Sequence, residues 1–71
     1  MIRNEAQLQQ ALEQIENLCR AVQSLRTRVF PQNPRNFAIL AEGPVDEIRK
    51  LQVDVDNYVT RLESAPAGAV V

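Results

Sequence analysis

The sequence predicts an all-α protein: an antiparallel hairpin of two helices that associates into an oligomeric helical bundle. Apolar residues recur every three or four positions over two stretches, about 5–29 and 44–63. This spacing places them on one face of a helix. The size of the chain is a further observation, because 71 residues form a marginal core by themselves and often need another chain.

The first helix is predicted to begin near Glu5. Asn4 is a good N-cap residue, and Gln7 follows three positions later, as in a capping box. Ile2, just before the helix, and Leu8, just inside it, are expected to pack together. From Glu5 to position 29 no Gly or Pro interrupts the chain, so one helix of about 38 Å is expected.

An apolar stripe runs along this first helix without a missed step. Leu12 and Cys19 flank the stripe and widen it toward a face that can touch two neighbours. The first stripe consists of Leu8, Ala11, Ile15, Leu18, Val22, Leu25 and Val29.

The segment after the first helix is predicted to carry a short connecting helix. Pro31 ends the first helix, because proline disfavours helical geometry in the residue before it. Asn33 as a cap and Pro34 at the first helical position favour a helix over about 34–42. Phe37 and Leu40 would then cover the end of the hairpin.

Gly43 and Pro44 are expected to break the chain direction and start the second long helix, about 44–63. Asp46 and Glu47 in its first turn complement the helix dipole. Val45 and Val59 lie beside the second stripe, and Val53 falls off it. The second stripe consists of Ile48, Leu51, Val55, Tyr58 and Leu62.

Residues 1–63 are therefore predicted to form one helical-hairpin domain, and 64–71, with small residues, a Pro and a Gly, a disordered C-terminal tail. Burial of the two stripes should form the core and the contacts between chains. The predicted core and interface residues are Leu8, Leu12, Ile15, Leu18, Val22, Leu25, Val29, Phe37, Leu40, Ile48, Leu51, Val55, Tyr58 and Leu62.

The residue types argue against catalysis, a metal site or a cofactor. The chain has no His, which removes the commonest general base and transition-metal ligand. Cys19 is the only cysteine, so no intrachain disulfide can form, and we expect a buried thiol in a reducing compartment. Asp54 and Asp56 are two positions apart, so they should point to different sides of a helix. We expect no enzyme, no catalytic residue and no cofactor.

The charge balance favours no strongly charged partner. Eight Lys and Arg against nine Asp and Glu give a formal charge of −1, which does not favour nucleic acid. A local patch of Arg20, Arg26, Arg28 and Arg35 keeps a small nucleic-acid-binding regulator as the alternative, although no aromatic residues are interleaved with these arginines. No apolar run reaches membrane-spanning length, and the N-terminus lacks the apolar core of a signal peptide, so a cytoplasmic protein is expected.

The start of the chain resembles the opening of HigA-type antitoxins of bacterial toxin-antitoxin systems. This resemblance implies a helical interaction module from bacteria, with a toxin as a protein partner. The second helix, with Leu51, Val55 and Tyr58, is similar to the second helix of the same region. No helix-turn-helix domain follows before Val71, so DNA binding is not implied. The matching residues are Ile2-Arg3-Asn4-Glu5, Leu8, Ala11-Leu12, Ile15-Glu16 and Leu18.

Taken together, these patterns predict a small non-catalytic protein-protein interaction module that self-associates through apolar helix faces. A homodimer, forming a four-helix bundle of coiled-coil type, is the first expectation, and larger oligomers fit the same pattern. A specific protein partner is the second expectation. No membrane partner is expected.

Overall fold

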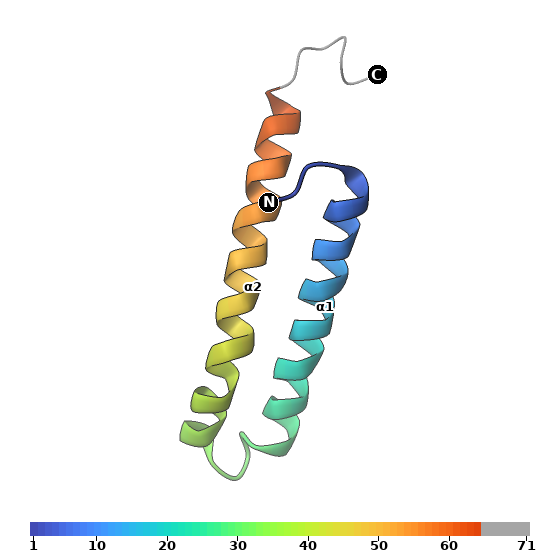
Figure 1. Ribbon diagram of the computed structural model, residues 1–71. Helices are drawn as coiled ribbons and strands as arrows, with labels where there is room; N and C mark the ends of the chain where they lie inside the picture. The colour runs from blue at the N-terminus through green and yellow to red at the C-terminus, as the bar shows by residue number, and fades with distance from the viewer. Residues whose placement is uncertain (65–71) are drawn as a thin grey trace.

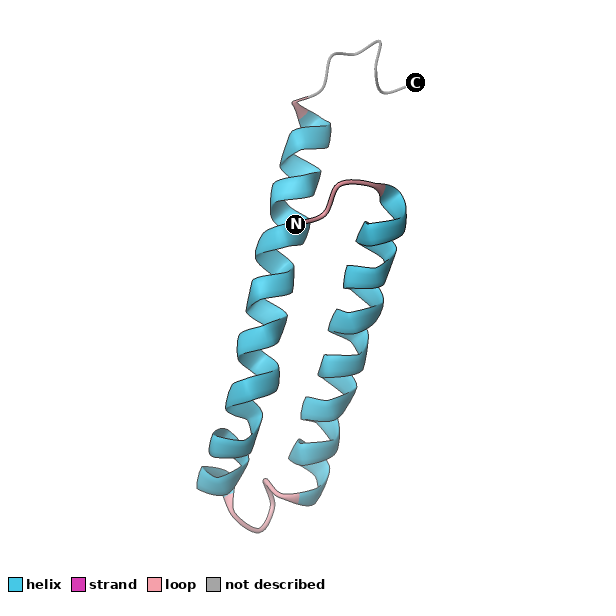
Figure 2. Ribbon diagram, in the orientation of Figure 1, coloured by secondary structure: helices cyan, strands magenta, loops and turns pink. Residues whose placement is uncertain are grey.

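The computed structural model of the chain describes residues 1–64, which form two helices packed against each other. Helix α1 spans Glu5–Arg28 and helix α2 spans Pro34–Glu63. They run antiparallel, side by side (Figure 1). Figure 2 shows only helix and short loops over the described residues, so the predicted all-α hairpin is confirmed for this part of the chain.

Helix α1 begins and is capped as its sequence predicts. The Asn4 side chain accepts a hydrogen bond of 2.9 Å from the Gln7 backbone N–H. The Gln7 side chain in turn accepts a bond of 2.7 Å from the Arg3 backbone N–H. These two bonds satisfy donors at the start of the helix and fix the direction of the N-terminal arm, residues 1–4.

A tight turn joins the two helices. The Val29 N–H bonds to the Leu25 carbonyl at 2.8 Å, and the Asn33 N–H bonds to the Val29 carbonyl at 2.8 Å. Asn33 then caps α2, because its side chain accepts a 3.0 Å bond from the Asn36 N–H. The rings of Phe30 and Phe37 meet edge to face across the turn, with centroids 5.4 Å apart.

The predicted connecting helix over 34–42 and the break at Gly43 and Pro44 are wrong as separate features, since α2 is continuous from residue 34 to 63. Pro44 removes one helical N–H, which costs about 3 kcal/mol in a helix interior. Packing against α1 on both sides of the proline offsets this cost: Ala41 is buried and Ile48 is half-buried. Gly43 also lacks the Cβ that a following proline would crowd.

The interior of the hairpin is very small. Within the described residues only Ile2, Ala11 and Ala41 are buried, and no large side chain is completely shielded from solvent. Ala11 lies on the first stripe. Ala41 continues the second stripe toward the turn with the same spacing, since it lies four residues after Phe37 and three before Pro44.

The N-terminal arm folds back over the hairpin and is tied to α2. Ile2 is only 5% exposed and lies in a depression lined also by Ala11 and Leu51. The Arg61 guanidinium donates a hydrogen bond to the Ile2 carbonyl and lies 5.6 Å from the centre of the Tyr58 ring. Figure 1 shows the N-terminus lying against α2.

Two further predictions meet different outcomes. The expected burial of Cys19 is wrong, because its side chain is exposed; it flanks the stripe at a position that the second helix does not reach. The predicted tail over 64–71 lies outside the described residues except for Ser64, which forms the C-cap of α2.

Candidate interaction surface

The predicted core residues divide into two groups by exposure. Three of them are exposed: Leu12 at 48%, Leu40 at 46% and Leu62 at 51%. The others are half-buried, so each stripe is only partly covered by the opposite helix. The half-buried residues are Leu8, Ile15, Leu18, Val22, Leu25, Val29, Phe37, Ile48, Leu51, Val55 and Tyr58.

One flank of the hairpin carries a second set of apolar residues, which we call the open side. On α1 it consists of Leu12 and Cys19, seven residues apart and hence on one helix face. On α2 it consists of the apolar Val45 and Val59 and the polar Gln52 between them, again at intervals of seven. A groove lined by Leu12, Ile15, Gln52, Val55 and Asp56 shows that the two sets lie on the same flank.

The opposite flank, which we call the arm side, is polar and partly covered. Gln7 and Gln14 of α1 and Asp54 of α2 line its depression together with Ile2. Arg61 continues this row along α2, seven residues after Asp54, and bonds to the arm. The two flanks of the same helix pair therefore differ in both polarity and cover.

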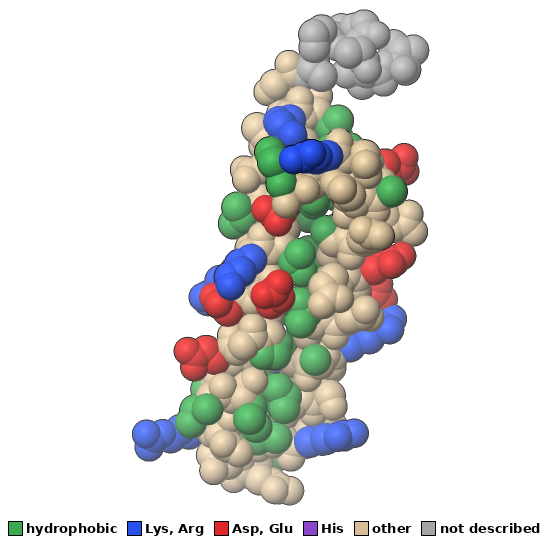
Figure 3. All heavy atoms as spheres, in the orientation of Figure 1, with side chains coloured by type: hydrophobic (Ala, Val, Ile, Leu, Met, Phe, Trp, Pro, Cys, Tyr) green, Lys and Arg blue, Asp and Glu red, His purple; other side chains and the backbone are tan. Residues whose placement is uncertain are grey.

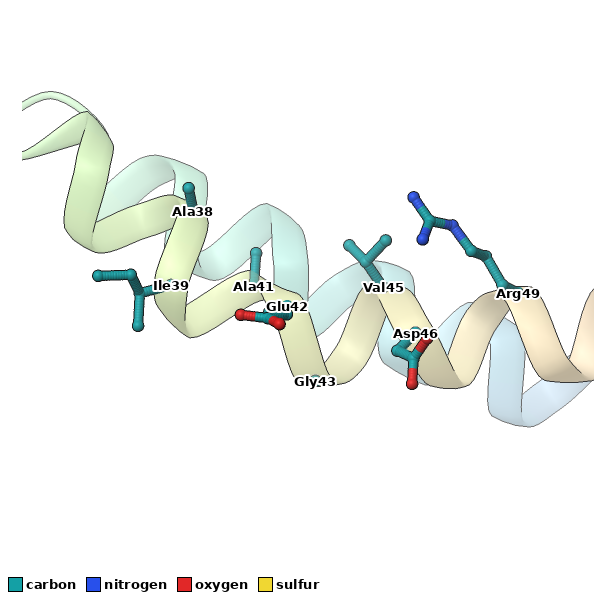
Figure 4. A pocket seen from close by; sticks show the side chains of 8 residues that line it. All are labelled: Ala38, Ile39, Ala41, Glu42, Gly43, Val45, Asp46 and Arg49. Atoms are coloured by element: carbon teal, nitrogen blue, oxygen red, sulfur yellow. The ribbon is translucent and has the colours of Figure 1, made fainter.

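Near the turn, the open side continues into a shallow depression on α2. Figure 4 shows Ala38, Val45 and Arg49 pointing to the same side of α2, with Ile39 pointing away from them. The depression exists because Ala38, Ala41 and Gly43 have little or no side chain. Apart from its chain neighbours and the nearby backbone of α2, an added Cβ at Gly43 would meet no atom within 4 Å.

Charged side chains border the seam between the helices. On the face seen in Figure 3, hydrophobic side chains follow the line where the two helices meet and most charged ones lie outside it. The described residues contain two ion pairs, Glu16 with Arg20 at 2.6 Å and Asp46 with Lys50 at 3.8 Å. All four side chains are well exposed, so these pairs contribute little to stability.

The four arginines of the alternative prediction do not all come together. Arg26 and Arg28 lie in the last turn of α1 and Arg35 in the first turn of α2, so these three gather at the turn end of the hairpin. Arg20 lies farther along α1 and is paired with Glu16. The structure therefore brings three of the four arginines to the turn end of the hairpin, with Arg26 and Arg28 two positions apart on α1 and so directed to different sides of that helix.

The residues that could serve catalysis or metal binding are scattered. Asp54 lines the arm-side depression and Asp56 the open-side groove, so the two carboxylates lie on different sides, as predicted. Among residues 1–64, no group of three or more His, Cys, Asp or Glu side chains could hold a metal ion. The same part of the chain contains no helix long and apolar enough to cross a membrane.

Three residues that matter for this surface were absent from the predicted set. Ile2 and Ala41 are buried, and Val45 extends the open side. Ala41 carried a usable signal, since it continues the second stripe four residues before Val45 and seven before Ile48. Ile2 was expected only to pack on Leu8 at the start of the helix, and no local pattern predicts its burial against α2. Comparisons of the chain with protein-family models, with curated proteins and with solved structures found no match.

Proposed function

We propose that the chain is a small non-catalytic interaction module that self-associates through its apolar helix faces. The observation that supports this proposal most directly is the lack of a closed interior: no large side chain among residues 1–64 is fully buried. Half-covered stripes on two helices are the surfaces that helical bundles bury by adding helices.

A homodimer is the simplest assembly. A second copy supplies two more helices with the same stripes, which gives a four-helix bundle, and symmetric dimers are the commonest oligomers. Burying a half-exposed Leu or Val side chain more fully contributes roughly 1 kcal/mol, so several such residues together can offset the entropy of association.

Sedimentation equilibrium of the purified chain tests this proposal. We expect a mass that rises above 8.0 kDa within the micromolar range and reaches twice that value. A protein that stays at 8.0 kDa up to several hundred micromolar would contradict it.

A specific protein partner is the second form of the proposal. The resemblance of residues 2–18 to HigA-type antitoxins supports a toxin-like partner in a bacterial cytoplasm, and an exposed free thiol suits such a reducing compartment. Affinity capture from the native host tests this form. We expect a toxin-like protein encoded next to this chain; capture of only the chain itself would leave self-association as the sole interaction and contradict the antitoxin-like form.

Nucleic-acid binding is the alternative function, and one observation favours it: Arg26, Arg28 and Arg35 gather, all exposed, at the turn. Phosphate contacts by these side chains would make binding strongly dependent on salt. Replacing both Arg26 and Arg28 by Ala should then weaken retention on DNA or RNA at low salt. No retention of the unmodified chain at low salt would dispose of this function.

A further inference from the structure

We infer that the open side is the dimer contact, and that a second copy docks there with the two-fold axis parallel to the helices. In this arrangement α1 of each copy lies on α2 of its partner. The inference rests on the self-association proposed above and adds to it which flank is used and in which orientation.

The two flanks are not equally available to a partner. The arm side is occupied by Ile2 and carries Gln7, Gln14 and Asp54. The open side instead exposes Leu12 at 48% and Val59 at 39%, and the polar residues of its groove are Gln52 and Asp56. The core of a protein-protein contact is depleted in charge and enriched in apolar side chains, so the open side fits this role.

The size of the open side matches a stable dimer. Helix α1 has 24 residues and is therefore about 36 Å long, and two adjacent helices are about 20 Å wide. A contact over this face would cover roughly 700 Å² of each copy, close to the ~800 Å² per partner of a standard interface.

Charges along the edges of the open side select the orientation. Because Leu12 and Ile15 share a groove with Gln52 and Val55, the antiparallel helices bring Glu16 and Arg49 to about the same height. Glu16 lies on the outer edge between Leu12 and Cys19, and Arg49 lies on the outer edge between Val45 and Gln52. At this height Glu16, which also pairs with Arg20 of its own helix at 2.6 Å, is the acidic group of one edge, and Arg49 is the basic group of the other.

A two-fold axis parallel to the helices leaves each residue at the same position along the helix axis. It places the α1 edge of each copy opposite the α2 edge of its partner. Glu16 of each copy then meets Arg49 of its partner, which gives two equivalent ion pairs. An axis across the helices, passing at the same height, instead places Glu16 against Glu16 and Arg49 against Arg49. The charge pattern therefore favours the parallel axis, since like charges at a contact oppose binding.

The same arrangement places the apolar residues against one another. Leu12 of one copy lies over the partner's Val55 and Val59, and Cys19 lies over the partner's Val45. The accessibility of the Cys19 thiol therefore reports dimer formation, because the thiol is exposed in the single chain and covered in the dimer.

Charge reversal tests the orientation. Glu16→Lys and Arg49→Glu each put like charges at both pairs, so each variant alone should dimerise at least about tenfold more weakly. An equimolar mixture of the two variants restores opposite charges at both pairs and should dimerise nearly as well as the unmodified chain. Glu13→Lys, the same change at an exposed position outside both flanks, is the matched control.

Alkylation of Cys19 tests the flank. Its rate should fall as the protein concentration rises through the dimer transition, and Leu12→Lys should abolish this protection while circular dichroism shows that the helices persist. A dimer that leaves Cys19 freely reactive, or that tolerates Leu12→Lys, would overturn the choice of flank. Weakened single variants that do not recover on mixing would overturn the orientation. A chain that is monomeric throughout would instead refute the proposed self-association itself.

Discussion

The arm side and the open side border the same helix pair, yet only one of them is covered. On the arm side, Ile2 is 5% exposed and Arg61 holds its carbonyl. On the open side, Leu12 is 48% exposed and no residue of the described chain covers it. The difference shows that four residues ahead of a helix can close one flank of a hairpin while the other flank stays uncovered.

The largest expected effect comes from placing a charge at the floor of each flank. Ile15 lines the open-side groove and Leu51 the arm-side depression, and both are half-buried. Ile15→Asp and Leu51→Asp should each cost about 3 kcal/mol or more, because an unpaired carboxylate enters an apolar contact. A domain of this size has only a few kcal/mol of stability, so both variants should be largely unfolded by circular dichroism.

The control for this prediction is Val53→Asp. Val53 lies on α2, is 56% exposed and belongs to neither flank, so its replacement should be tolerated. Thermal melting curves of the Ile15 and Leu51 variants that match the unmodified chain would show that the faces are assigned wrongly.

A second pair of variants separates the two flanks. Ile2→Ala removes a buried side chain and should cost about 2 kcal/mol at any protein concentration. Leu12→Ala should cost less than about 1 kcal/mol in dilute solution, where its side chain is half in water, and more at concentrations where the protein dimerises. Urea unfolding at low and high protein concentration measures both. If Leu12→Ala lowered the free energy of unfolding by the same amount at low and high protein concentration, the distinction between the flanks would be contradicted.

A third pair concerns the arm itself. Asn4→Ala and Asn33→Ala each remove an N-cap and should each cost about 1 kcal/mol of unfolding free energy. Only Asn4→Ala should also loosen the arm, because the Asn4 cap sets the register in which the Arg3 N–H bonds to Gln7. Faster hydrogen exchange of the Arg3 amide in this variant alone is the expected readout.

The smallest effect is expected at the depression of the open side. Gly43→Ala should change stability by less than about 0.5 kcal/mol while Pro44 is present, because the gain in helix propensity is offset by crowding from the proline. In a Pro44→Ala background the same change should stabilise by about 1 kcal/mol. A double-mutant cycle of thermal unfolding measures this coupling, and strictly additive effects would contradict it.

The local pattern of the chain was enough to predict much of the fold. The start of α1 follows from Asn4 and Gln7, and the stripes of both helices follow from their three-and-four spacing. Gly43 and Pro44 misled the prediction of α2, because propensity alone does not include the packing of Ala41 and Ile48 against α1. Cys19 was misplaced for a related reason: a residue beside a stripe is buried only if a neighbour reaches it.

The candidate surface could be predicted only in part. Leu12 and Val59 were visible as apolar residues beside the stripes, but their shared flank depends on the height at which α1 and α2 meet. The return of Ile2 to the arm side depends on a contact with Arg61, 59 residues away in the sequence. Contacts of this kind have no local signature.

The sequence by itself determined helix α1, the caps at Asn4 and Asn33 and the apolar stripes, because backbone geometry and side-chain spacing act over a few neighbouring residues. Only the tertiary structure decided that α2 continues through Pro44, and that Ile2 covers one flank while Leu12 and Cys19 stay uncovered on the other. The physical reason is that burial depends on which surfaces two packed helices bring within reach, and this is a property of the pair that neither helix has alone.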